Sequence, residues 1–219
     1  KDFRVLLLDA RGFGKSPLVA PFLIEQMVDD VLETLDGLGV PQAVFVGNSM
    51  GGYVALRLAE KTPARVRALV LCDTRAEADG NEAKAKRAAA IEAVRSKGMS
   101  AFAEPFLQGA LASRPFTTSP MAVDFLRQLI LKADPAAVMN ALAALAARPE
   151  TLPALSSFRF PPLILVGSHD QLPPLECAQT MRGRSTGSEL HIIPDAGHFP
   201  SVENPKVFNE KLVSFLGRI

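Results

Sequence analysis

The chain has 219 residues, of which 48% are hydrophobic and 21% charged, and its formal net charge is +1. This length is enough for one sizeable core plus an insertion. A charge so near zero gives no reason to expect nucleic acid or an anionic membrane as a partner. No apolar run reaches the length of a membrane span. Composition therefore predicts a soluble, cytoplasmic globular protein with neither nucleic-acid nor membrane partners.

Strand-like and helix-like segments alternate through the first third of the chain. The hydrophobic patterns predict a strand, a helix, a strand, a helix and a strand, in that order, at Arg4–Asp9, Phe22–Leu38, Ala43–Gly47, Gly51–Glu60 and Val66–Cys72. Such alternation is typical of a mostly parallel sheet flanked by helices. We therefore expect an α/β fold.

The character of the chain changes near residue 75, where strand signals vanish and alanine becomes frequent. Helical patterns separated by prolines occur at Glu82–Ser96, Ala101–Leu111, Ala122–Leu131 and Pro135–Arg148. Strand and helix signals alternate again from residue 158 to a last helix at Pro205–Leu216. We expect residues 1–73 and 158–219 to form the α/β core, and residues 74–157 to form a helical cap insertion at the catalytic edge of the sheet.

A G-x-S-x-G pentapeptide centred on Ser49 stands between an apolar strand-like run and a helix-like run. A serine in that context occupies a very sharp turn, and we expect Gly47 and Gly51 to remove side chains that would collide there. The helix that follows points unpaired backbone N–H groups at the serine, the first of them that of Met50. The pattern predicts that Ser49 is a nucleophile.

A serine needs a base, and the base needs an acid that orients it. The strand predicted at Pro162–Gly167 is followed by Asp170, and the strand predicted at Leu190–Ile193 is followed by His198. Catalytic groups in open parallel sheets gather beyond the carboxyl ends of the strands. We therefore expect Ser49, Asp170 and His198 to form a catalytic triad.

Four blocks resemble the α/β-hydrolase family, and more narrowly its small esterase and lactonase branch, which includes 3-oxoadipate enol-lactonase-like proteins. The blocks are Leu8–Ser16, the turn around Ser49, Gly167–Pro174 and Pro194–His198. The resemblance implies that Ser49 is the nucleophile, His198 the general base and Asp170 the orienting acid. It also implies that the Met50 N–H is one oxyanion donor. The match is not specific for substrate, and the leading hypothesis is a serine hydrolase that cleaves a small ester or lactone through an acyl-enzyme, a mechanism that requires no cofactor.

The chain departs from the family pattern at its start. Family members have further strands and a His-Gly-type loop there, and that loop supplies a second oxyanion donor. The sequence shows neither, so we expect the second donor not to be present in this chain and the strand at Arg4–Asp9 to lack its family neighbour. Either that strand pairs with the next one instead, or another chain fills the gap, or the sequence is a fragment of a longer protein. An exposed apolar strand edge invites pairing with another chain. We therefore expect either a poor catalyst or a homodimer.

Other activities on the same three residues are alternatives to ester or lactone hydrolysis. C–C bond hydrolysis, thioester hydrolysis and cofactor-free perhydrolysis use the same triad chemistry. A binding or receptor protein that keeps the fold but turns over little is an alternative of a different class. Release of a burst of nitrophenol from a short-chain nitrophenyl ester would distinguish an enzyme from a binding protein.

Several polar residues near these motifs have simpler interpretations. Asp73 ends the strand before the insertion and is the rival candidate for the acid that serves His198. His169 neighbours the favoured acid, and we expect it to have a surface or loop role. We expect His191, within a strand, to be structural, and Asp195 to stabilise a tight turn.

The sequence offers no metal site and no disulfide framework. Its three histidines and two cysteines lie at no metal-ligand spacing. Cys72 falls in a strand and Cys177 in a predicted helix, and we expect both to be buried free thiols.

Overall fold

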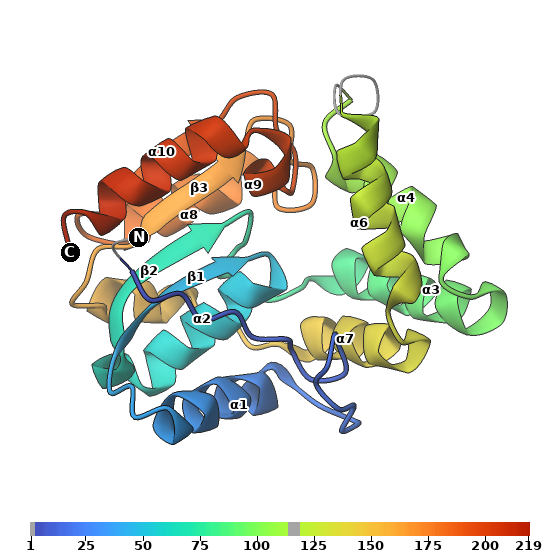
Figure 1. The fold of residues 1–219 in the computed structure, drawn as a ribbon, viewed down its shortest axis with the longest axis horizontal. Helices are drawn as coiled ribbons and strands as arrows, with labels where there is room; N and C mark the ends of the chain where they lie inside the picture. The colour runs from blue at the N-terminus through green and yellow to red at the C-terminus, as the bar shows by residue number, and fades with distance from the viewer. Residues whose placement is uncertain (1–2, 114–118) are drawn as a thin grey trace.

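The computed structural model describes residues 3–113 and 119–219, and these contain one four-stranded sheet. The strands stand in the order β1 (Ala43–Asn48), β2 (Val66–Cys72), β3 (Leu163–Gly167) and β4 (Glu189–Ile193). Every neighbouring pair is parallel. The carboxyl ends of all four strands therefore meet at one edge of the sheet (Figure 1). This confirms the α/β fold and the four strands predicted at these places.

Helices cover both faces of the sheet. The helices are α1 (Ile24–Gly37), α2 (Met50–Lys61), α8 (Leu175–Arg184) and α10 (Pro205–Leu216). The first three pack on one face and α10 packs on the other (Figure 1). Side chains alternate along β2, so that Leu69 and Leu71 enter one core while Val70 enters the other. Both faces of β2 are therefore buried from Ala68 to Cys72, whereas Arg67 is exposed.

The described residues between β2 and β3 are mostly helical. Its helices are α3 (Asn81–Lys97), α4 (Ser100–Ala110), α6 (Pro120–Lys132) and α7 (Pro135–Ala147), and they lie beside the sheet rather than on its faces (Figure 1). All four were predicted, with bounds that differ by a few residues. No single helix in the described part of the chain is long and apolar enough to cross a membrane. Only α6 and α7 taken together, which are bent by 96° at their junction, pass that test.

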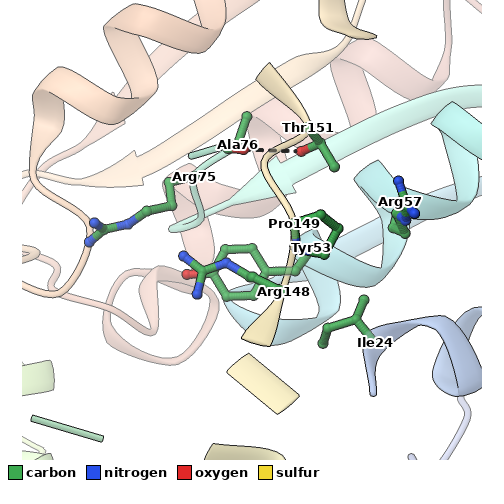
Figure 2. Close-up of a pocket in the computed structure, with 8 residues that line it drawn as sticks. All are labelled: Ile24, Tyr53, Arg57, Arg75, Ala76, Arg148, Pro149 and Thr151. Carbon is green, nitrogen blue, oxygen red and sulfur yellow. Dashed lines mark hydrogen bonds between the residues drawn. The ribbon is translucent and has the colours of Figure 1, made fainter. Parts of the chain in front are cut away.

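The two ends of this insertion are joined to each other at the edge of the sheet. Thr151 N donates to Ala76 O at 2.8 Å, and Arg148 pairs with Asp79 at 2.8 Å. The Arg148 guanidinium also lies over the Tyr53 ring of α2, 4.1 Å from the ring centre. Figure 2 shows the two side chains next to each other. A cavity of about 10 Å³ beside these two side chains has room for about one water molecule. The base of the insertion is thus fixed to the core by charge, stacking and backbone bonds.

The Asp79 carboxylate should make stability depend on pH. Its side chain is 1% exposed and is paired with both Arg87 and Arg148. Burial raises its pKa, but the hydrogen bond from Arg87 and the charges of the two arginines outweigh burial, so the pKa is lowered. A carboxyl group with a lowered folded pKa stabilises the fold above its unfolded pKa, and this contribution is lost as pH falls through the folded pKa.

We therefore expect Asp79→Asn to lower the free energy of unfolding at pH 7 by about 3 kcal/mol, because Arg148 is left buried beside a neutral group. The loss should shrink as pH falls toward 3. Urea unfolding at several pH values measures both effects. The matched control is Glu92→Gln, which removes an exposed ion pair with Arg95 and should change stability by less than about 0.5 kcal/mol. Equal pH dependence in wild type and Asp79→Asn would contradict the prediction.

The strand predicted at Arg4–Asp9 is wrong. These residues are irregular and largely exposed, with Val5 75% and Leu7 89% accessible, and no described residue pairs with the outer edge of β1. Strand preference is expressed only where a segment pairs and packs against neighbours, and here it does neither. The segment instead ends in a turn, where Lys15 N donates to Asp9 Oδ2 at 3.0 Å.

Candidate active site

Ser49 occupies a strained turn between β1 and α2. Its φ of 51° and ψ of −114° lie in a region that non-glycine residues rarely adopt. Two neighbours hold it there: Ser49 N donates to Cys72 O at 2.9 Å, and Thr74 Oγ1 donates to Ser49 O at 2.9 Å. The sharp strand-to-helix turn predicted from the pentapeptide is therefore present. Such a turn is typical of a nucleophile at the end of a strand.

Gly47 and Gly52 leave the space that this turn needs, whereas the sequence predicted this role for Gly47 and Gly51. A Cβ on Gly47 would overlap the backbone of Gly51, as predicted. A Cβ on Gly51 itself would meet nothing within 4 Å, so the prediction of a collision there is wrong. Gly51 is exposed on the outer side of the first helical turn. Gly52 needs the space instead, because its Cβ would lie 2.5 Å from Cγ2 of Thr74.

The loops after β3 and β4 bring Asp170 and His198 together. His198 Nδ1 lies 2.9 Å from Asp170 Oδ2, and the two side chains are 3% and 0% exposed, respectively. Leu172 N donates to the other carboxylate oxygen at 2.9 Å. Asp170 is thus fixed by one backbone donor and one imidazole. With its proton on Nδ1, the imidazole keeps a lone pair on Nε2 that can act as a base.

The backbone of His198 is held by the core and by the insertion. Its N–H donates to Ala110 O at 2.6 Å, at the end of α4. Its carbonyl accepts from the Asn48 side chain at 3.3 Å, and Asn48 directly precedes Ser49. The histidine loop is therefore tied to the serine turn on one side and to the insertion on the other. No direct hydrogen bond joins the described side chains of Ser49 and His198, and catalytic contacts often tighten only when substrate is bound.

Glu203 is a site-supporting residue that the sequence analysis missed. It lies in the short helix α9 (Pro200–Glu203), where Oε1 accepts from Phe199 N at 3.0 Å and Oε2 accepts from Ala112 N at 2.9 Å. One carboxylate thus links the histidine loop to the insertion. The proline and glutamate of this segment are ordinary signals of a helix start. These two residue types do not predict the hydrogen bond between Glu203 and Ala112 N.

Asp73, the rival acid, lies beside the Asp170–His198 pair. It is 1% exposed, has a φ of 44°, and its Oδ1 accepts from Gly167 N at 2.8 Å. Its Oδ2 is buried without a partner. Burial is the main cause that raises the pKa of Asp73 to about 9. The hydrogen bond from Gly167 N lowers this pKa, and the neighbouring Asp170 raises it. The hydrogen bond of His198 goes to Asp170, as the favoured assignment requires.

Among the described residues, one group of three side chains has the composition and spacing of a metal site. One oxygen each of Asp73 and Asp170 and one ring nitrogen of His198 lie within 4.8 Å of one another. The sequence spacing did not predict this group, because the fold assembles it from three separate loops. The Asp170 and His198 side chains of this group are already joined by the hydrogen bond between Oδ2 and Nδ1. The group is therefore better described as an acid–histidine pair with a second carboxyl behind it.

The remaining histidines lie outside this arrangement. His169 is exposed, and its Nδ1 lies 2.8 Å from Ser168 Oγ. His191 lies in β4, where its Nε2 is 3.5 Å from Glu189 Oε2. Asp195 adopts a φ of 55° in the turn after β4. These positions agree with the loop, strand and turn roles expected of the three residues.

Both cysteines are free thiols. Cys72 is buried in β2, as expected, whereas Cys177 is only half-buried in α8. Burial is the largest cause of a raised pKa for both thiols. Neither therefore has the lowered pKa of an activated thiol nucleophile.

Aromatic rings lead from the insertion to the histidine. Phe102 and Phe106 of α4 stack at 5.3 Å, and Phe106 contacts Phe199 edge-on at 6.2 Å. Phe199 in turn lies 5.4 Å from the His198 ring. The side of the imidazole that faces the insertion is therefore lined by aromatic side chains.

Comparisons with known proteins agree with this fold and site. A model of the alpha/beta hydrolase family matches residues 1–211. The chain is 31% identical to 3-oxoadipate enol-lactonase 2 of Acinetobacter baylyi, over 98% of this chain and 79% of the relative. A thermophilic esterase from Thermogutta terrifontis superposes with a TM-score of 0.92 at 36% identity, covering 96% of this chain and 78% of the esterase. The enol-lactonase from Burkholderia xenovorans superposes with a TM-score of 0.87 at 27% identity, covering 95% of this chain and 79% of the lactonase.

These matches extend over nearly the whole chain, and they include both the sheet and the helices between β2 and β3. They agree with the resemblance drawn from the four sequence blocks, including its narrower branch of esterases and enol-lactonases. Hydrolysis is the chemistry that the named relatives share. The chain belongs to the alpha/beta hydrolase family.

Proposed function

We propose that this protein is a serine hydrolase that cleaves a small carboxylic ester or lactone. The observation that carries the proposal is the buried 2.9 Å hydrogen bond between Asp170 and His198, on a loop tied to the strained turn of Ser49. A serine hydroxyl becomes a nucleophile when a base that an acid orients can take its proton. The esterase and the enol-lactonases among the relatives support this class of substrate.

In this mechanism the Ser49 hydroxyl attacks the substrate carbonyl while His198 Nε2 accepts its proton. Asp170 holds the other imidazole proton on Nδ1 and stabilises the charged imidazolium. The Met50 N–H at the start of α2 has no earlier helical carbonyl to bind, so it is available to the oxyanion. His198 then gives its proton to the leaving alcohol, and an acyl-enzyme remains. Water that His198 deprotonates releases the acid.

The surroundings of His198 support an apolar substrate. Phe199 contacts the imidazole edge-on, and Phe106 of the insertion contacts Phe199 edge-on. Aromatic rings bury apolar groups well but offer no partner to a charged substituent. We therefore propose that the group on the insertion side of the scissile carbonyl is uncharged and mainly hydrocarbon.

A serine-directed fluorophosphonate tests the assignment of the nucleophile. We expect it to label Ser49 alone, because only this serine combines a strained strand-to-helix turn with a histidine that a buried acid orients. Peptide mass spectrometry of the labelled protein identifies the site. Ser49→Ala should abolish labelling and lower kcat for a nitrophenyl ester by about 10⁶-fold.

Ser168 provides the matched control. Its Oγ lies 2.8 Å from a histidine nitrogen, but this Ser168–His169 pair is exposed. Ser168→Ala should therefore leave labelling and turnover unchanged. Label on Ser168, or none on a folded protein that hydrolyses esters, would contradict the proposed mechanism.

A further inference from the structure

A second carboxyl lies directly behind the acid–histidine pair, and the mechanism does not use it. Asp73 follows β2, and one of its oxygens lies within 4.8 Å of both an Asp170 oxygen and a His198 nitrogen. Its Oδ1 is occupied by the Gly167 N–H, whereas its Oδ2 is buried with no partner. An orphaned buried oxygen is costly unless it makes a hydrogen bond.

Two ionised carboxylates in this space would repel each other strongly, because both are removed from water. Asp170 has the better support for a negative charge, since it accepts from Leu172 N and from the imidazole. Asp73 accepts from a single backbone N–H, on the oxygen that is not orphaned. A proton on Asp73 Oδ2 turns the orphaned acceptor into a donor and removes the repulsion.

We infer that Asp73 is a neutral carboxylic acid whose Oδ2–H donates a hydrogen bond to the Asp170 carboxylate, so that it is a positioning residue for the acid–histidine pair. Its effect on turnover rests on the proposed function, but the carboxyl pair itself does not. The donor withdraws charge from Asp170 and thereby weakens the hold of Asp170 on the imidazolium.

The groups that surround Asp73 favour its neutral form. Burial is the largest cause of the rise in the pKa of Asp73 to about 9. The hydrogen bond from the Gly167 N–H lowers this pKa, whereas the negative charges of Asp170 and Glu203 raise it further. The Cys72 thiol next to it stays neutral, because burial raises its own pKa. The titratable groups that face Asp73 from the packed elements are Cys72 of β2, Asp170 after β3, His198 after β4 and Glu203 of α9.

Asparagine tests the inference because it imitates a protonated aspartate. In Asp73→Asn the amide oxygen can accept from Gly167 N and the amide N–H can donate to Asp170, and asparagine tolerates the positive φ. We expect kcat/KM within about threefold of wild type and an unchanged acid limb of its pH profile. Asp73→Ala removes the donor. It should lower kcat/KM by about tenfold and move the acid limb to higher pH, because Asp170 then holds the imidazolium more strongly.

A negatively charged Asp73 predicts the opposite result. Its replacement by asparagine would remove a negative charge that stabilises the imidazolium, and would therefore move the acid limb of the kcat/KM profile to lower pH. A loss of more than about 100-fold in Asp73→Asn together with such a shift would overturn the inference. The same loss without any shift would also overturn it, since the amide would then fail as a mimic of the neutral acid.

Infrared spectroscopy gives a readout that does not depend on catalysis. At pH 7 the wild type should show the carbonyl band of a protonated carboxylic acid, absent from Asp73→Asn, and the band should disappear as pH rises through about 9. Absence of the band at pH 7 would overturn the inference. The band in a protein that fails to hydrolyse esters would support the carboxyl pair and contradict the proposed function, so the two failures are distinguishable.

Discussion

Asp170→Asn should lower kcat by about 10⁴-fold, the scale on which serine triads depend on their acid. The carboxylate accepts the Nδ1 proton of His198 at 2.9 Å, whereas an amide can donate to Nδ1 and force the proton onto Nε2. An imidazole in that tautomer cannot take the proton of Ser49. KM should change little, because the Asp170 side chain is 0% exposed and cannot touch a substrate. Steady-state kinetics with a short-chain nitrophenyl ester measure both constants.

Asp134→Asn is the matched control, since it makes the same chemical change at the start of a helix in the insertion. Asp134 begins α7, where Oδ1 accepts from Ala136 N at 2.7 Å. Asparagine is an equally good residue at a helix start, so activity and stability should stay at their wild-type values. A larger loss of kcat in Asp73→Asn than in Asp170→Asn would assign the acid to Asp73 and contradict the proposed triad.

The sequence predicts the elements of this fold well where local signals suffice. The bounds of β2 and α10 agree with the predicted residues. β2 contains the apolar run Ala68–Cys72, which breaks off at Asp73, and α10 begins at a proline and is followed by a glycine. The prediction for Arg4–Asp9 fails although its composition is equally strand-like. Whether such a run becomes a strand is decided by a neighbour elsewhere in the chain, and that information is not local.

The candidate site shows the same division between local and distant information. The chain order of Asp170 and His198 predicts their meeting, because each follows a parallel strand and such strands end at one edge. The roles of Asn48 and Glu203 are not predictable in this way. Asn48 donates to a backbone carbonyl 150 residues away, and Glu203 accepts from a backbone N–H 91 residues away. Any residue supplies such backbone groups, so no sequence pattern marks these contacts.

Gly167→Ala is expected to damage both stability and turnover, because Gly167 ends β3 at the point where the acid and histidine loops touch. A Cβ there would overlap the carbonyl oxygen of Gly197 and lie 2.5 Å from that of Ala196. Backbone atoms cannot yield as a flexible side chain can, so the loop that carries His198 must move. Overpacking of this kind costs about 1–3 kcal/mol of unfolding free energy. A displacement of about 1 Å at a catalytic group can lower kcat by about 100-fold.

Gly183→Ala separates this steric effect from the change of residue type. Gly183 lies in α8, and a Cβ there would meet nothing within 4 Å. Alanine is the better helix former, so this variant should gain up to about 1 kcal/mol of stability and keep its turnover. Urea unfolding and ester kinetics on the two variants test the pair. Wild-type stability and turnover in Gly167→Ala would mean that the histidine loop is free to shift without loss, and that the close contact between the two loops does not position His198.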